Sequence, residues 1–105
     1  MDINTIRILI SQKRYQVKHH AIHHALQEGF NETHIVDCIS SGKIIEHYSD
    51  RNRVLIAGKI ILEDESHTFL HVIVEQNYPN QIEIVTAYIP NESEWRTPYK
   101  RRRKR

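Results

Sequence analysis

The 105-residue sequence has a single cysteine, Cys38, and no long run of apolar residues. One cysteine excludes an intrachain disulfide and a cysteine-based zinc site. No segment approaches the roughly 20 apolar residues that a membrane-spanning helix needs. The N-terminal residues include acidic Asp2 and do not resemble a secretory signal. We therefore expect a soluble, cytoplasmic protein that does not bind membranes.

Several motifs of common enzyme classes are also absent. The chain contains no P-loop, no G-x-G-x-x-G and no G-x-S-x-G, which excludes the best-known phosphate-binding loops and the serine hydrolase elbow. The acidic run at residues 63–65 lacks a calcium-loop pattern around it and is expected to be a solvated turn. Cys38 lies among apolar residues of a predicted helix, so we expect a small buried hydrophobe rather than a nucleophile.

Positive charge is concentrated at the C-terminus. The chain ends in KRRRKR, whose first four residues are Lys100, Arg101, Arg102 and Arg103. Without these six residues, nine Lys and Arg face thirteen Asp and Glu, so the rest of the chain carries a net charge of −4. Blocks of like charge are often disordered arms that bind partners. Residues 97–105 are therefore expected to form a disordered tail that binds RNA phosphates or an acidic partner, the alternative being a tail that only solubilises or derives from a vector.

Apolar residues of the N-terminal part repeat at helical spacing. This pattern predicts helices over residues 3–13 and 19–28. A third helix is expected to begin after Asn31, a good N-cap residue, and to end at Gly42. Residues 15–17, between the first two helices, are expected to be a short extended link.

After Gly42 the periodicity is that of strands. Four strands are predicted, near residues 44–48, 54–62, 68–75 and 81–88. Gly58 indicates a bulge or a close backbone approach. The last strand is expected to place on one face Ile82, Ile84, Thr86 and Tyr88. Helices followed by hairpin-connected strands predict an α+β fold, with two to three N-terminal helices packed on a four-stranded antiparallel sheet in a single domain of residues 1–96.

Four histidines lie close together on the second predicted helix: His19, His20, His23 and His24. They form two i,i+4 pairs, a spacing that can hold zinc, nickel or copper. The protease motif H-E-x-x-H is absent, and a closed zinc site would need two further ligands. We therefore expect no metal and no cofactor, with a metal-binding helix as the alternative.

His71 and Tyr88 lie on the last two predicted strands. Histidine is the usual acid or base when RNA is cleaved by internal attack of its 2′-hydroxyl. Such a site needs a positive group for the phosphate and no metal. His20, His71 and Tyr88 would meet if the second helix packed across the ends of these strands. In the alternative, His71 is structural and Tyr88 packs at the rim.

A series of short features in a fixed order resembles a known family. The features are Tyr15, His20-Ala21, Gly29, Gly42, Ile44-Ile45-Glu46, Tyr48, LHVIV at 70–74, VTAYIP at 85–90 and Trp95. Over residues 14–96 they resemble the bacterial family of domains of unknown function numbered 4258. That family is similar in layout to small ribonuclease toxins of the RelE, BrnT or barnase kind. Its members often look like the toxin halves of type II toxin–antitoxin pairs, and some of the antitoxins resemble the zinc-finger MqsA type.

The resemblance implies roles for three residues. His20 matches the histidine of the family's His-Ala pair, His71 the strand histidine, and Tyr88 the tyrosine before a proline. His20 and His71 would be the general acid and base in unassigned order, and Tyr88 would orient a phosphate or a base. The implied function is that of a metal-independent endoribonuclease, with RNA as substrate and an antitoxin as protein partner.

Two positions depart from the family pattern, which runs His-Ala-x-x-Arg and then Arg-Gly. The first arginine is replaced by His24 and the second by Glu28. His24 could replace a cation only when protonated, and Glu28 reverses the charge. Other residues would then hold the RNA backbone, namely His24, Arg51, Arg53, Arg96, Lys100, Arg101, Arg102 and Arg103. The alternative is a non-catalytic module that binds an antitoxin-like partner or nucleic acid.

Overall fold

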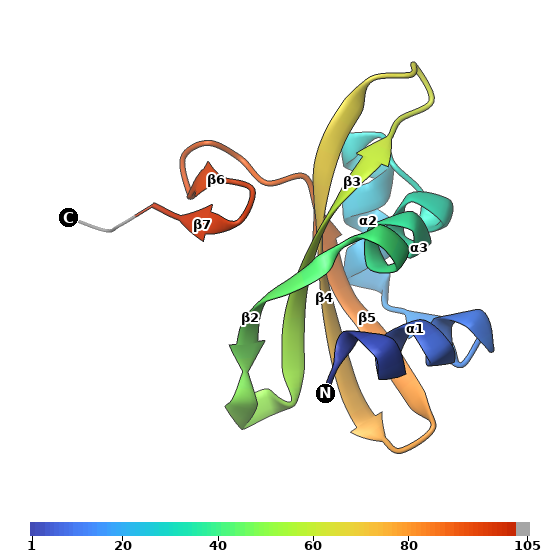
Figure 1. Cartoon of the computed structure of the whole chain (residues 1–105). Coiled ribbons are helices and arrows are strands. Elements are labelled where there is room, and N and C mark those ends of the chain that lie inside the picture. The colour runs from blue at the N-terminus through green and yellow to red at the C-terminus, as the bar shows by residue number, and fades with distance from the viewer. Residues whose placement is uncertain (103–105) are drawn as a thin grey trace.

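The computed structural model describes residues 1–102 (Figure 1). Its helices are α1 (Ile3–Ser11), α2 (His19–Glu28) and α3 (Glu32–Ser41). The predicted bounds of α2 are confirmed, whereas α1 ends before the predicted residue 13. It ends early because Lys13 adopts a left-handed conformation (φ 58°) and its N–H bonds back to Ile10 O at 3.0 Å. No helix within residues 1–102 has the length and apolar character that crossing a membrane requires.

Capping residues explain where the helices begin and end. The Asp2 carboxylate accepts a hydrogen bond from Thr5 N at 2.8 Å at the start of α1. Gly29 takes the left-handed conformation (φ 81°) that ends α2. Asn31 begins α3 with a capping box, in which Asn31 N donates to His34 Nδ1 at 2.9 Å.

The main sheet has five strands and is mixed. Its strands are β1 (Tyr15–Val17), β2 (Lys43–Tyr48), β3 (Arg53–Ile61), β4 (His67–Tyr78) and β5 (Gln81–Tyr88), arranged in the order β1-β5-β4-β3-β2. Strands β2 to β5 are antiparallel, as predicted, and a short 3₁₀ helix η1 (Ser49–Arg51) joins β2 to β3. The fold is α+β, as predicted. The sheet, however, has five strands instead of four, because β1 adds a strand that was not predicted.

Strand β1 was expected to be only an extended link. It pairs in parallel with Ile82–Ile84 of β5, since the link between α1 and α2 runs along the free edge of that strand. Backbone hydrogen bonds fix both of its ends, from Ile82 N to Arg14 O at 3.1 Å and from Lys18 N to Ile84 O at 2.9 Å. Three residues are too few for periodicity to indicate a strand, and the pairing is tertiary.

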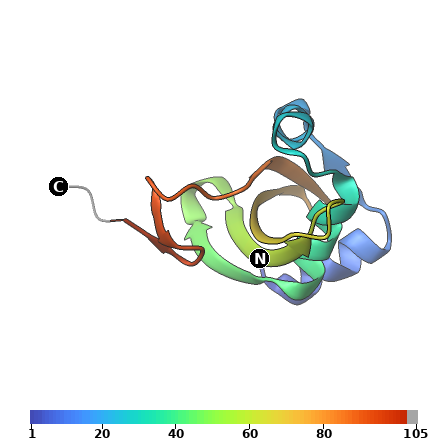
Figure 2. The same cartoon turned by 90° about the horizontal axis from the view of Figure 1, so that it is seen from above.

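The three helices cover one face of the sheet, and a small C-terminal hairpin lies on the opposite side (Figures 1 and 2). That hairpin consists of β6 (Trp95–Thr97) and β7 (Lys100–Arg101). The main core lies between the helices and the sheet. Its fully buried residues include Ile6, Ile35, Ile39, Leu70, Val72, Val74, Ile82 and Ile84.

A bulge in β5 decides which way Tyr88 points. The pairing of β4 with β5 shifts between Ile73 and Val74, whose partners are Thr86 and Ile84, so Val85 is the extra residue. After the bulge Ala87 joins the main core, while Tyr88 pairs with His71 on the far face. The prediction that Thr86 and Tyr88 share a face with Ile82 and Ile84 was therefore wrong.

Gly58 of β3 lies where the backbone of α3 packs closely on the sheet. A Cβ at Gly58 would lie 2.4 Å from Cys38 O, in the backbone of α3. Because backbone atoms cannot move aside singly, we expect Gly58→Ala to lower the free energy of unfolding by about 2 kcal/mol. Chemical denaturation measures this. Lys59→Ala, at the exposed neighbouring position, is the control and should change stability by less than about 0.5 kcal/mol. Equal stability of the two variants would contradict the close packing.

Candidate functional site

The far face of the sheet carries a second buried cluster, separate from the main core. At its centre His71 is fully buried and Trp95, at the start of the hairpin, is 3% exposed. The His71 ring meets the rings of Trp95 and Tyr88 edge-on, with centroid distances of 4.4 and 5.2 Å. The structure thus brings together two of the three predicted catalytic residues, His71 and Tyr88.

The hydrogen bonds of His71 define its tautomer. Its Nε2 lies 2.6 Å from the Pro98 carbonyl oxygen, which can only accept, so Nε2 carries a proton. In the neutral ring Nδ1 then accepts from the Tyr88 hydroxyl at 3.3 Å. Burial lowers the pKa of His71, which favours this neutral form. Both ring nitrogens are occupied within the protein, so this geometry favours a positioning role for His71 over proton exchange with a substrate.

Tyr88 keeps its proton in this environment. Burial, with a smaller contribution from Tyr48, raises the pKa of Tyr88 to about 12. Its hydroxyl is therefore a neutral donor at physiological pH. His71 orients this hydroxyl at the end of β5, where the strand reaches the surface.

Arg101 is fixed to the sheet by an ion pair. Its Nε and Nη2 donate to the two carboxylate oxygens of Glu46 at 2.8 and 3.1 Å, and its guanidinium stacks over Trp95 at 4.6 Å. Burial would raise the pKa of Glu46, but hydrogen bonds from Arg101 and Tyr48 outweigh it and lower that pKa. The hydrogen bond to Glu46 raises the pKa of Arg101, so the pair stays charged.

The hairpin has a second anchor at Tyr99. The Tyr99 ring meets Phe69 edge-on at 5.4 Å, and Lys43 Nζ lies 4.3 Å from its centroid. The prediction of a disordered tail over residues 97–105 does not hold for its first part, because Thr97 lies in β6 and residues 100–101 form β7. Residues 103–105 lie outside the described residues. Charge alone predicted disorder because it does not reveal the acidic and aromatic partners that the sheet supplies.

A cleft of about 480 Å³ opens between α2, the end of β5 and the hairpin. Three predicted site residues line it together, namely His24, Tyr88 and Arg101. The remaining lining residues are Glu28, Ile89, Asn91 and Glu94. The pocket thus combines an imidazole, a phenol hydroxyl and a guanidinium, which are groups that act on phosphates.

Within the cleft His24 is oriented by Glu28. His24 Nδ1 lies 2.7 Å from Glu28 Oε2, and because a carboxylate accepts, Nδ1 carries the proton. Glu28 Oε1 in turn accepts from Ile89 N at 2.9 Å, which fixes the carboxylate. The neutral imidazole then has Nε2 as its acceptor. Sequence reasoning missed the role of Glu28, although its i,i+4 spacing from His24 could have indicated the contact.

The third predicted catalytic residue, His20, lies elsewhere. It is exposed on α2, and its ring contacts His24 edge-on at 4.6 Å. Among residues 1–102 no hydrogen bond or ring contact joins His20 to His71 or Tyr88. The helix packs beside the end of β5, so His24, one turn further on, reaches the cleft.

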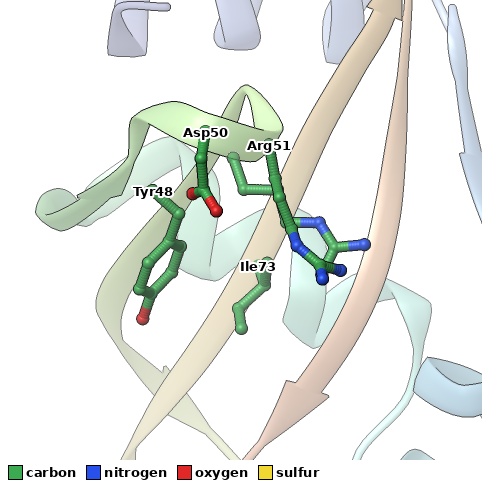
Figure 3. A pocket seen from close by; sticks show the side chains of 5 residues that line it. Tyr48, Asp50, Arg51 and Ile73 are labelled. Carbon is green, nitrogen blue, oxygen red and sulfur yellow. The ribbon is translucent and has the colours of Figure 1, made fainter.

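The other predicted RNA-binding residues that the structure describes do not line the cleft. Arg51 and Arg53 line a separate cavity of about 290 Å³ (Figure 3), and Arg53 is paired with Glu75 at 2.7 Å. Arg96 lines a third cavity. Lys100 and Arg102 are exposed at the hairpin. Arg103 lies outside the described residues.

The histidine run does not form a metal centre in the described part of the chain. Within residues 1–102, no three side chains of His, Cys, Asp or Glu gather at a distance suited to one metal ion. Cys38 is buried, and burial raises the pKa of its thiol to about 12. Its sulfur donates to Leu70 O at 3.3 Å, which suits a packing residue.

Residues 17–89 match the family model described as "Domain of unknown function (DUF4258)". The chain belongs to this family. The match spans α2 to the end of β5, and so includes His24, Glu28, His71 and Tyr88, while the hairpin that carries Arg101 follows it. No curated protein and no solved structure matches the chain.

The burial of His71 predicts a pH dependence of stability. Its folded-state pKa lies below the ordinary 6.5, so the unfolded chain binds a proton more readily. The free energy of unfolding should therefore fall as the pH is lowered from about 7.5 through the ordinary histidine range. His71→Gln retains a donor for Pro98 but cannot titrate, and should flatten this part of the profile. Denaturant titrations at several pH values test this, and parallel profiles for both proteins would contradict it.

Proposed function

We propose that this protein is a metal-independent endoribonuclease that uses the cleft between α2 and the C-terminal hairpin. The observation that carries the proposal is the meeting of His24, Tyr88 and Arg101 in that one cleft, with the His24 tautomer set by Glu28. Each group suits a step of RNA cleavage by the neighbouring 2′-hydroxyl, which requires a base, a donor and a cation but no metal.

In this mechanism His24 is the general base. Its Nε2 accepts the proton of the 2′-hydroxyl, and the 2′-oxygen attacks phosphorus. The bond to the 5′-oxygen breaks, leaving a 2′,3′-cyclic phosphate. The Tyr88 O–H turns from His71 Nδ1 to the leaving 5′-oxygen and transfers its proton there. Exchange with water then removes the proton from His24 and restores that of Tyr88, which returns to His71 Nδ1. His71 is a positioning residue that holds the Tyr88 hydroxyl.

Arg101 supplies the positive charge for the phosphate. Its Nε and Nη2 are used by Glu46, while Nη1 has no hydrogen-bond partner among residues 1–102. Two carboxylates also line the cleft. The charge of Glu28 is offset by His24 and by Ile89 N, whereas Glu94 has no ion pair within the described residues. A phosphate is therefore best placed on the Arg101 side of the cleft.

The biological context of the proposal comes from the family resemblance. RelE-like and BrnT-like proteins are toxin halves of type II toxin–antitoxin pairs. We propose the same role here, with cytoplasmic RNA as substrate and a cognate antitoxin as partner.

The second candidate function is a non-catalytic interaction module, and two features favour it. The Glu94 carboxylate opposes a phosphate in the cleft. On the other side of the molecule, α2 and α3 border an apolar groove of about 250 Å³, where Leu26 is 80% and Ile22 is 45% exposed. Such surfaces commonly contact protein partners.

We expect His24→Ala to reduce RNA cleavage by roughly 10²- to 10⁴-fold, the usual contribution of one general base. His23→Ala, a change at an exposed position on the same helix, is the matched control and should leave cleavage intact. Cleavage of a fluorogenic oligoribonucleotide in EDTA measures both, and growth after induction in cells is the parallel readout.

His20→Ala decides between the two histidines. Because His20 only contacts His24 edge-on, its loss should reduce cleavage less than the loss of His24. A larger loss in His20→Ala would return the catalytic role to His20. No cleavage and no growth arrest with the folded wild-type protein would favour the interaction module.

A further inference from the structure

The cavity beside η1 lies on the same face of the sheet as the cleft. It holds about 290 Å³ and is lined by Tyr48, Asp50, Arg51, Arg53 and Ile73 (Figure 3). Ile73 follows His71 by two residues on β4, so the cavity lies about 7 Å further along that strand. Tyr48 lines this cavity, and its hydroxyl accepts a hydrogen bond at 3.4 Å from Nη2 of Arg101, which lines the cleft. A chain bound in the cleft can therefore continue into this cavity.

Arg51 is the available cation of the cavity. The other arginine, Arg53, donates through Nε to Glu75 at 2.7 Å and is held as part of the wall. Within residues 1–102, Arg51 takes part in no salt bridge. Its exposed guanidinium can therefore bind a phosphate, the ligand that this planar fork suits best.

Asp50 places an acceptor in the same cavity. Figure 3 shows its carboxylate between Tyr48 and Arg51, with Ile73 below. In the described part of the chain it forms no salt bridge with either arginine. A carboxylate so placed recognises a ligand edge that offers N–H donors, because its two oxygens only accept.

The remaining walls are flat and apolar. Tyr48 and Ile73 are each half-buried, and part of each side chain faces the cavity. An aromatic ring stacks well on a nucleobase, but only where that base is not already stacked in a duplex. The cavity thus suits a ligand with a phosphate, a planar base and N–H donors on one edge.

We propose that this cavity binds one guanine nucleotide of single-stranded RNA, next to the nucleotide held in the cleft. Guanine has adjacent N1–H and N2–H donors that match the two oxygens of Asp50, whereas uracil has one N–H between two carbonyl oxygens. The base packs on Tyr48 and Ile73, and its phosphate binds Arg51. The proposal rests on the proposed function and adds a base preference to it.

The test uses oligonucleotides that cannot be cleaved. Fluorescein-labelled 2′-O-methyl oligouridine lacks the attacking hydroxyl, and a second probe carries one guanine in the middle. Fluorescence anisotropy with the full chain should show tighter binding of the guanine probe by about tenfold. Asp50→Asn should abolish this preference.

Arg51→Ala should weaken binding of both probes equally and reduce the slope of log K against log salt by about one. Arg14→Ala is its matched control, because Arg14 is an exposed arginine before β1, at the opposite edge of the sheet. That variant should bind both probes as the wild type does. All of these substitutions are at exposed positions, so the fold should be kept. An unchanged thermal unfolding temperature for each variant would verify this.

Equal binding of the two probes by the wild type, or a guanine preference that persists in Asp50→Asn, would overturn the proposal. Cleavage of RNA in the separate assay would then leave the proposed function standing. Conversely, a guanine preference that requires Asp50, without any cleavage of RNA, would support this cavity and reject the nuclease.

Discussion

The hydrogen bond from His71 to the Pro98 carbonyl joins the centre of the sheet to the C-terminal hairpin, and the site depends on it. A buried imidazole must satisfy both nitrogens, and here Pro98 and Tyr88 do so at 2.6 and 3.3 Å. A hairpin as short as β6–β7 has no stability of its own. Its position is therefore set by its contacts with the sheet. At the buried end Trp95 packs on His71, and at the rim Arg101 pairs with Glu46.

This dependence makes the cleft a composite of both sides of the fold. His24 and Glu28 come from a helix on one face, Tyr88 from the end of β5, and Arg101 from the hairpin on the other face. Tyr88 can join them only because the bulge at Val85 turns it away from the main core. The fold elements are ordinary, and the site arises where they meet at the end of one strand.

Much of the fold was predictable from local pattern, and the site was predictable only in part. The bounds of α2 and the four antiparallel strands follow from periodicity and turn residues, which are local signals. Strand β1 and the bulge at Val85 depend on neighbouring strands, and no local pattern marks them. The expectation that His20, His71 and Tyr88 would meet was conditional on how the second helix packs. His71 and Tyr88 do meet, after the bulge at Val85, whereas His24 and not His20 lines the cleft.

The basic C-terminus shows the same limit in electrostatic terms. A run of like charge predicts repulsion and disorder only if no counter-charge lies nearby. Here Glu46 accepts two hydrogen bonds from Arg101, and Tyr99 packs between Phe69 and Lys43. These partners are 30 to 56 residues distant in sequence and become visible only once the strands are paired.

The two departures from the family pattern are best understood as one change. An arginine at position 28 would leave the imidazole at position 24 without an acceptor for Nδ1–H and would repel its protonated form. With Glu28 in place, the same helical spacing orients His24 and compensates any charge that it gains. In the proposed nuclease, His24 and Glu28 together would exchange two fixed cations for an oriented acid–base group. The proposed mechanism then needs its positive charge from outside the helix, and Arg101, which lines the cleft, would supply it.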